Sequence, residues 1–192
     1  EVIKSRQTLD KLTKSSGQIH LDNNIIALDN QHALFLHDGK SYLFNVLKLY
    51  QQMILKRIKE TILESKQLVS RPVLVPLMVA LSETKIKTFP FELLKTYGFD
   101  INIMSTNTIA VRAFPILTPH IDLSAFIKAI ANSNQPKIEE IIADNQLLCL
   151  AQLNTDEQSS LLRFLINTEQ HNQANMAYKC LTQQHWQEIL SK

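Results

Sequence analysis

Glycine is scarce in this chain of 192 residues, which contains only three. They stand far apart, at Gly17, Gly39 and Gly98. A phosphate-binding loop brings backbone amides against its ligand, and that close approach requires several residues without a side chain. The nucleophile elbow of many hydrolases also requires glycine on both sides of its serine. The sequence therefore predicts neither a nucleotide-binding loop nor a catalytic serine of that kind.

Cysteine and clustered histidine are lacking as well. Cys149 and Cys180 are the only cysteines, and Cys149 stands in an apolar stretch, which is typical of a reduced, buried thiol. The six histidines are scattered and show none of the Cys-x-x-Cys or His-Glu-x-x-His spacings that hold metal ions. We therefore expect no disulfide, no metal and no cofactor in this chain.

Long apolar segments are absent too. No run approaches the roughly eighteen residues needed to cross a bilayer, and the chain opens at Glu1 without the charged and then apolar leader of a secreted protein. We expect no membrane contact and a cytoplasmic location. The polar residues 1–15 are expected to form a linker tail of a longer protein.

Neither sign of charge dominates the chain, whose formal net charge is +2. The distribution is uneven, because residues 1–95 hold 14 basic against 9 acidic side chains, whereas residues 96–192 hold 6 against 9. A basic group at Lys48, Lys56, Arg57 and Lys59 is a candidate DNA contact, but no aromatic residues interleave with it. Weak DNA binding and a solvated helix face are the two interpretations.

Apolar residues, which make up 45% of the chain, alternate in some stretches and recur at helical spacing in others. Asp38-Gly39 is a hairpin signal, and Pro72 and Pro76 suit an edge strand. The predicted strands are 18–28 and 32–44 as a three- or four-stranded meander, 72–81, and a hairpin over 99–111. The predicted helices are 43–63, 83–97, 123–131, 136–150, 159–167 and a last one around Trp186. This mixture predicts an α+β fold.

Several residues mark where the helices should begin and end. Pro90 should divide the helix over 83–97, and Gly98 should end it in the left-handed conformation. Pro136 suits the first turn of the helix that follows it. The side chains suited to capping helix N-termini are Ser82, Asp122, and Thr155 together with Gln158 as a capping box.

A series of short stretches, in one order along the chain, resembles a known family. They are Gly17-Gln18, Ala33 to His37 before Asp38-Gly39, Arg71-Pro-Val-Leu-Val-Pro-Leu77, Ser82, Tyr97-Gly98-Phe99-Asp100 and Thr108-Ile-Ala-Val-Arg112-Ala-Phe-Pro115. Together they resemble the C-terminal dimerisation domain of the MutL family of DNA mismatch repair proteins. The last stretch is the most specific, since Val-Arg-Ala-x-Pro after a short strand is characteristic of that family.

The resemblance implies two lobes, each a small antiparallel or mixed sheet with flanking helices. Residues 16–70 and 155–192, from both chain ends, would form an inner dimerisation lobe, and residues 71–154 an outer lobe. The implied function is homodimerisation, with ATP and magnesium expected only in a separate N-terminal ATPase domain. The candidate interface side chains, for which a plain core role is the equal alternative, are Ile19, Leu21, Leu34, Leu36, Trp186 and Leu190.

Many members of the family are latent endonucleases with the motif Asp-Gln-His-Ala, two residues, Glu, four residues, Glu. Here Asn30-Gln-His-Ala33 resembles its start, but Leu36 and Ser41 stand where the glutamates are required. When the neighbouring family stretches are used to align the motif, Asp38-Gly-Lys-Ser41 stands at its position and keeps only its first residue, the aspartate. Two further nuclease elements are missing, at Ala143-Asp-Asn145 and around Lys179-Cys-Leu-Thr182. We therefore expect no enzyme here.

What remains resembles the branch in which a separate MutH-type endonuclease makes the nick. The implied partners are MutS, that endonuclease, a UvrD-type helicase and, weakly, DNA. Residues Arg71, Pro72, Val73, Leu74, Val75 and Pro76 are similar to the family's sliding-clamp-binding motif Gln-Pro-Leu-Leu-Ile-Pro. Arg71 replaces the glutamine, and an ordinary edge strand is the alternative interpretation.

Two functions of other classes stay open. A metal-dependent endonuclease would use carboxylates and imidazoles around the first hairpins, where Asp29, His32, His37 and Asp38 stand. A DNA-binding module would act through the basic helix over 43–63.

Overall fold

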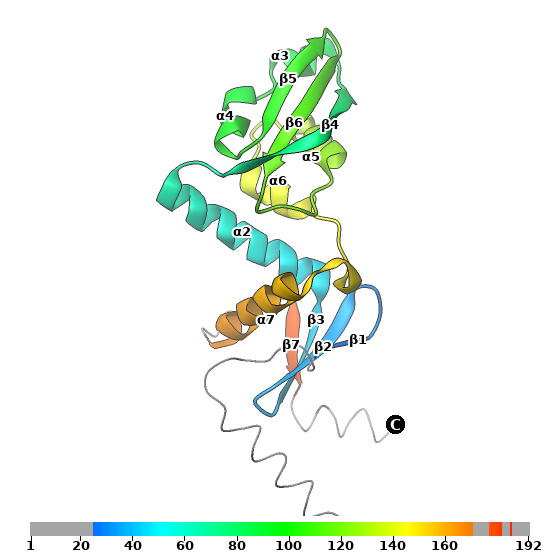
Figure 1. Ribbon diagram of the computed structural model, residues 1–192, viewed down its shortest axis with the longest axis vertical. Helices are drawn as coiled ribbons and strands as arrows, with labels where there is room; N and C mark the ends of the chain where they lie inside the picture. The colour runs from blue at the N-terminus through cyan, green and yellow to red at the C-terminus, as the bar shows by residue number, and fades with distance from the viewer. Residues whose placement is uncertain (1–24, 171–176, 182–184, 186–192) are drawn as a thin grey trace, which may run out of the picture.

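The computed structural model describes residues 25–170, 177–181 and 185. The molecule is elongated, with one sheet at each end of its long axis and helices between and beside them (Figure 1). The sheet orders are β1-β2-β3-β7 and β4-β6-β5, and all strand pairs are antiparallel. This architecture confirms the predicted α+β fold.

The first sheet grows from a hairpin. Its strands are β1 Ile25–Ala27, β2 His32–His37, β3 Lys40–Asn45 and β7 Tyr178–Leu181. Asp38 and Gly39 both adopt positive φ, at 49° and 73°, which is the geometry of a two-residue turn that matches strand twist. The predicted hairpin is confirmed. Strand β7, which the sequence did not indicate, pairs with β3 across a long stretch of chain.

Two helices cover one face of this sheet, α2 (Val46–Ser65) and α7 (Thr155–Gln170) (Figure 1). The inward residues Phe35, Tyr42 and Phe44 are at most 2% exposed. The long helix was predicted from residue 43, but it begins at Val46 because residues 43 and 44 pair with both β2 and β7. The Asn45 side chain caps it by accepting a hydrogen bond from the Lys48 backbone N–H at 2.9 Å.

The second sheet has β6 (Thr108–Pro115) between β4 (Ser70–Ala80) and β5 (Asp100–Ser105). Strand β4 lies at an edge, as its prolines predict, and the β5–β6 hairpin is confirmed. Helix α5 (Leu123–Asn132) packs against this sheet, where Phe126 stacks on Phe99 at a centroid distance of 4.5 Å.

Helix ends in the second half largely follow the local signals. Pro90 separates α3 (Glu83–Lys87) from α4 (Phe91–Thr96), and Gly98 has φ 76° behind the second of them. Asp122 caps α5 through the Ala125 backbone N–H at 2.9 Å. Ser82 stands at the N-terminus of α3 but its side chain makes no capping hydrogen bond.

Two further helix predictions were wrong in their bounds. The helix expected over 136–150 is α6, which spans Ile138–Asp144 only. It ends early because Gln146 forms an isolated bridge with Ile121, after which the chain is irregular up to a single 3-10 turn at Leu150–Gln152. Helix α7 begins at Thr155 and continues to Gln170, so the predicted helix over 159–167 was too short at both ends.

The expected capping box of α7 was also misplaced, by one residue. The Glu157 carboxylate accepts from the Asn154 backbone N–H at 3.0 Å, and the Asn154 side-chain oxygen accepts from the Glu157 backbone N–H at 2.9 Å. These two reciprocal bonds satisfy two of the backbone donors at the helix start. The predicted Thr155 and Gln158 are therefore not the capping pair.

Other predictions concern thiols and chain ends. Both cysteines are free, as expected, although Cys149 is only partly buried, so its predicted burial was wrong. The linker tail over 1–15, the beginning of the first predicted strand and the last predicted helix lie outside the described residues. No helix in the described part of the chain has the length and apolar character needed to cross a membrane.

Candidate interaction surfaces

The outward face of the first sheet is mostly apolar, with Ser41 and Lys179 as its polar members on β3 and β7. Alternation along β2 points Leu34 and Leu36 away from the helices. Cross-strand pairing places Leu34 between Ile26 of β1 and Leu43 of β3. Leu36 is 41% exposed and Ile26 is 49% exposed. Within the described residues, α2 and α7 pack on the opposite face only (Figure 1). This outer sheet face is the apolar surface best suited to association.

Two of the six candidate interface residues therefore lie together on the outer sheet face, namely Leu34 and Leu36. The other four lie outside the described residues, and they are Ile19, Leu21, Trp186 and Leu190. Sequence reasoning did not single out Ile26, Leu43 or Leu181. Strand alternation could have indicated the first two, whereas Leu181 needed knowledge of the β3–β7 pairing.

A second apolar surface is the bulge in β4. The register of β4 on β6 shifts between Pro72 and Leu77, so the intervening residues leave the ladder. Leu74 is fully exposed at 104% relative accessibility, and Val75 is 80% exposed. Large apolar side chains held this far from the protein body are unusual in a monomer. The bulge contains the core of the candidate clamp motif.

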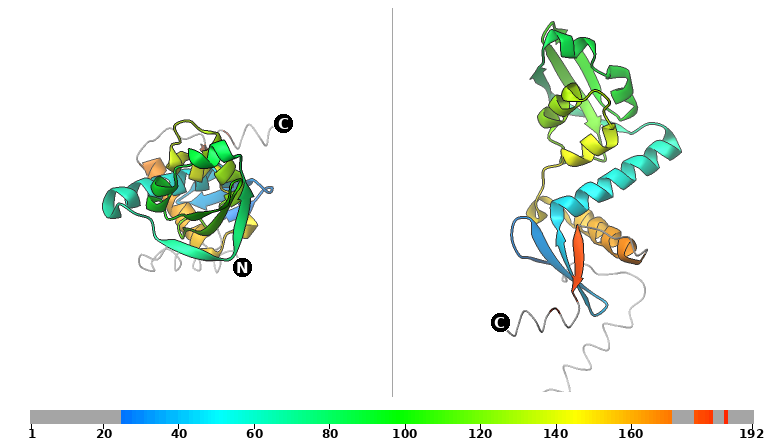
Figure 2. Two further views of the ribbon diagram at one scale, coloured as in Figure 1. Left: turned by 90° about the horizontal axis from the view of Figure 1, so that it is seen from above. Right: turned by 180° about the vertical axis from the view of Figure 1, so that it is seen from behind.

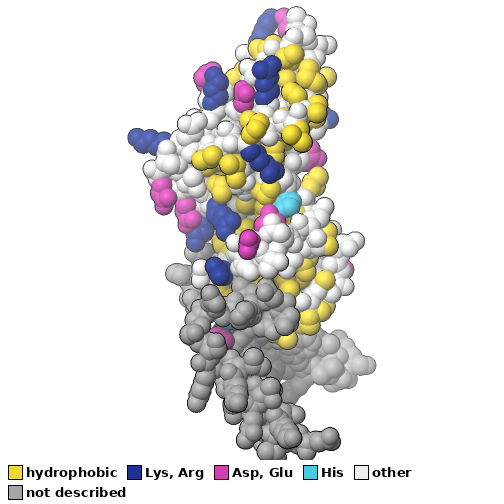
Figure 3. Space-filling view, in the orientation of Figure 1, with side chains coloured by type: hydrophobic (Ala, Val, Ile, Leu, Met, Phe, Trp, Pro, Cys, Tyr) yellow, Lys and Arg dark blue, Asp and Glu magenta, His cyan; other side chains and the backbone are white. Residues whose placement is uncertain are grey.

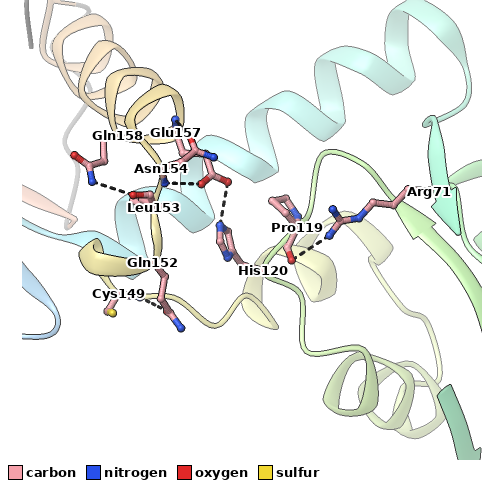
Figure 4. Close-up of polar contacts among 9 residues, drawn as sticks. All are labelled: Arg71, Pro119, His120, Cys149, Gln152, Leu153, Asn154, Glu157 and Gln158. Carbon is pink, nitrogen blue, oxygen red and sulfur yellow. Dashed lines mark hydrogen bonds and ion pairs between the residues drawn. The ribbon is translucent and has the colours of Figure 1, made fainter. Parts of the chain in front are cut away.

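Arg71, at the start of that motif, points elsewhere. Its guanidinium lies 4.4 Å from the centre of the Phe114 ring and donates a hydrogen bond to the Pro119 carbonyl at 3.4 Å (Figure 4). Its Nε is buried and has no hydrogen-bond partner among the described residues. Arg71 therefore secures the base of the second sheet, and the exposed part of the motif is limited to the bulge.

The basic side chains of α2 do not form one patch. Lys56 pairs with Glu60 at 3.8 Å and lies 6.0 Å from the Phe164 ring. Arg57 lines a cavity beside Ile116 and Pro119, on the far side of the helix from Lys48. In the view of Figure 3 the basic side chains are interspersed with acidic ones. The geometry therefore favours a solvated helix over a dedicated DNA-binding face.

The candidate catalytic group is spread over both ends of β2. Asp29 accepts hydrogen bonds from the backbone N–H groups of Gln31 and His32 at 2.6 and 2.7 Å, and its carboxylate contacts His32 Nδ1 at 3.0 Å. The Gln31 bond is the main reason that the pKa of Asp29 lies below its usual value. Asp38 stands beyond the other end of the strand, about 17 Å away at 3.3 Å per residue. Asp29 and Asp38 therefore cannot bind the same metal ion.

The junction between the two ends of the molecule is held by a polar chain. His120 Nε2 lies 3.0 Å from the Glu157 carboxylate, the group that also caps α7 (Figure 4). The His120 ring packs edge-on against Tyr50. The nearby Gln152 side chain accepts from the Cys149 backbone N–H at 2.8 Å. The contact between His120 and Glu157 links the segment that follows β6 to helix α7.

Glu169 makes a further link between α7 and the first sheet. Its carboxylate accepts from Lys40 Nζ at 2.8 Å and from the Tyr42 hydroxyl at 3.2 Å. The Lys40 bond is the largest cause of a lowered pKa at Glu169, and burial is the largest cause of a raised pKa at Tyr42. The helix is thereby attached to the sheet opposite the outer sheet face.

An α+β chain with an open apolar sheet face, and with no cluster of metal-binding side chains in its described part, has the properties of an association module. The family model described as the MutL C terminal dimerisation domain matches residues 25–155, and the chain belongs to that family. The DNA mismatch repair protein MutL of Ralstonia nicotianae (strain ATCC BAA-1114 / GMI1000) is 31% identical over 142 residues, covering 66% of this chain and 21% of that protein. The aligned part thus spans about a fifth of the relative's length.

Proposed function

We propose that this chain is the homodimerisation module of a MutL-like mismatch repair protein and that the outer sheet face forms its interface. The observation that carries the proposal is the row of apolar side chains, from Ile26 through Leu34 to Leu43, on a sheet face opposite the two covering helices. Burial of such a face against its own copy supplies the hydrophobic free energy that association requires.

The test is sedimentation equilibrium at micromolar concentration. The wild type should have twice the mass of one chain, and Leu36→Lys should raise the dimer dissociation constant at least about tenfold, because a charge placed in the interface core must be desolvated. Leu74→Lys, on the β4 bulge, is the matched control and should leave the mass unchanged. A wild type that sediments as a monomer at these concentrations refutes the proposal.

A second candidate function is contact with a sliding clamp through the β4 bulge. Leu74 and Val75 are the two most exposed apolar residues of the strand, and both lie where its register on β6 shifts. Because Arg71 is engaged with Phe114 and Pro119, the contact would depend on the bulge rather than on the residue that replaces the family's glutamine. Clamp binding measured by surface plasmon resonance should weaken about tenfold in Leu74→Ala. Leu147→Ala, also an exposed leucine, is the control, and equal binding by both variants excludes the bulge.

The division of the chain into an inner lobe, residues 16–70 and 155–192, and an outer lobe, residues 71–154, belongs to the same proposal. It is supported by the sheet orders, since the first sheet takes strands from both halves of the chain and the second takes them from the middle. Partner recruitment, to MutS, a MutH-type endonuclease, a UvrD-type helicase and DNA, is proposed for the whole protein. MutH-dependent nicking of mismatched DNA should fall when Leu36→Lys is placed in the full-length protein.

We also propose that the chain has no nuclease activity of its own. Leu36 and Ser41, at the positions of the family's motif glutamates, face each other across the β2–β3 hairpin. A leucine and a serine supply no carboxylate for a divalent ion. Plasmid nicking with manganese should equal that of a mock preparation, and nicking that is lost in His32→Ala would restore the endonuclease alternative.

A further inference from the structure

A small pocket of about 210 Å³ lies where three elements meet. Helix α2 packs against both α6 and α7 (Figure 2), and the pocket opens between α2, the start of α7 and the segment that follows β6. Each element contributes to its lining, with Tyr50 and Arg57 from α2, Ile116 from the segment and Asp156 from α7. None of the functions proposed above uses this pocket.

Tyr50 brings an unsatisfied hydroxyl to the pocket. The residue is only 2% exposed, yet its hydroxyl makes no hydrogen bond within the part of the chain that the structure describes. Its ring packs edge-on against His120 at a centroid distance of 5.6 Å. Burial is the largest cause of a raised pKa at Tyr50, so the hydroxyl stays protonated at neutral pH. A buried donor without a partner is unfavourable, so this hydroxyl gains when a ligand supplies an acceptor.

The charges around the pocket are of both signs. Arg57 is partly buried and Asp156 is exposed, and neither forms an ion pair or a side-chain hydrogen bond among the described residues. Glu157 is engaged through both oxygens, with His120 Nε2 and with the Asn154 backbone N–H. An anion would meet two carboxylates here, and a cation would meet a guanidinium. The arrangement therefore favours a neutral ligand with a strong dipole.

The rest of the lining is largely apolar. Met53 of α2 is 2% exposed, and Ile116, Leu117 and Pro119 belong to the segment after β6. An apolar cavity of roughly 150 Å³ is enough to hold benzene, so this pocket has room for a ring with one substituent. Removal of such a ring from water stabilises its binding.

We propose that this pocket binds a small neutral ligand that carries an amide, a carbonyl beside an N–H, on an apolar ring. The amide carbonyl accepts hydrogen bonds from the Tyr50 hydroxyl and the Arg57 guanidinium, and the amide N–H donates to the Asp156 carboxylate. An amide offers an acceptor and a donor without net charge, so it satisfies groups of both signs. A zwitterion would also match them, but it must give up the hydration of two full charges.

Three compounds of nearly equal shape and different charge test the proposal, namely benzamide, benzoate and benzamidine. NMR titration of the full chain should show saturable binding of benzamide, with benzoate and benzamidine at least about tenfold weaker, because each of them meets a like charge. Tyr50→Phe should weaken benzamide binding about fivefold, since one hydrogen bond is lost. Tyr97→Phe is the matched control, because it removes a hydroxyl that is bonded to Glu139 outside the pocket, and it should bind as the wild type does.

Asp156→Asn completes the experiment with a gain that loss of folding cannot produce. It removes a repulsion and keeps an acceptor, so benzoate should bind this variant more tightly than it binds the wild type. Leu36→Lys should bind benzamide normally, because the pocket is independent of the proposed dimer interface. No binding of benzamide at millimolar concentration overturns the proposal, as does equal affinity for the three compounds. Equal weakening by Tyr50→Phe and Tyr97→Phe also overturns it, because the ligand would then bind elsewhere.

Discussion

Two glycines with positive φ differ in what surrounds them. A Cβ added at Gly98 would lie 3.0 Å from the Leu68 carbonyl oxygen, whereas one at Gly39 would have nothing within 4 Å. Both positions are left-handed, so each substitution carries the usual backbone penalty of about 1 kcal/mol. Only the first adds a tight contact with backbone, from which Leu68 must move by a few tenths of an ångström.

We therefore predict that Gly98→Ala lowers the free energy of unfolding by about 2 kcal/mol or more, and that Gly39→Ala lowers it by about 1 kcal/mol. Urea titrations followed by circular dichroism measure both. Equal losses in the two variants would show that the close approach to Leu68 is relieved without strain.

The ion pair of Glu169 with Lys40 predicts a pH dependence. Because the bond lowers the pKa of Glu169 below its usual 4.5, its stabilising contribution is fully present above that value. The contribution is lost as pH falls through the lowered pKa. Glu169→Gln should therefore be less stable than the wild type at pH 7, and the difference should shrink as the pH falls below 4.5.

Unfolding curves at a series of pH values measure this difference. Glu92→Gln is a suitable control, since Glu92 forms an exposed pair within one helix and its side chain is 85% exposed. A difference between wild type and Glu169→Gln that is independent of pH would indicate packing rather than charge.

At the scale of elements, substitutions at the start of α7 can distinguish the observed cap, Asn154 with Glu157, from the expected one, Thr155 with Gln158. Asn154→Ala should lower the free energy of unfolding by about 1 kcal/mol, because it leaves the Glu157 backbone N–H without its acceptor. Thr155→Ala should change it by less than about 0.5 kcal/mol. Ser82→Ala, at a helix start where the side chain makes no capping bond, should behave like Thr155→Ala. A larger loss for Thr155→Ala would reinstate the expected capping box.

The elements that the sequence predicted well are those whose signals are local. Asp38-Gly39, Pro90, Gly98 and Asp122 each act on their own backbone or the next turn, and each has the predicted effect. The expected helix over 136–150 failed because its second half is engaged by a distant residue, Ile121.

The candidate surfaces were predictable to a similar degree. Alternation indicated that Leu34 and Leu36 share a face, but it could not say whether that face is covered. Likewise, four basic residues close together in the sequence suggested one patch, although the helix distributes them around its axis.

At the scale of the whole molecule, association should stabilise folding. If the outer sheet face is buried in a dimer, the unfolding temperature must rise with protein concentration, because only the folded state dimerises. Scanning calorimetry should be run at a low protein concentration and at about 5 and 100 times that concentration. The unfolding temperature of the wild type should rise progressively across the three. Leu36→Lys should show a smaller rise over the same range, and a wild type whose unfolding temperature is constant would contradict dimerisation.

The pairing of β3 with β7 has a consequence for synthesis. Leu43 meets Lys179 across most of the chain, so β3 leaves the ribosome on the order of ten seconds before its partner does, at 5–20 residues per second. During that interval the hairpin presents both an unpaired strand edge and an apolar face, the combination that promotes aggregation. Nascent chains stalled before Tyr178 should therefore recruit chaperones that chains extended past Leu181 release.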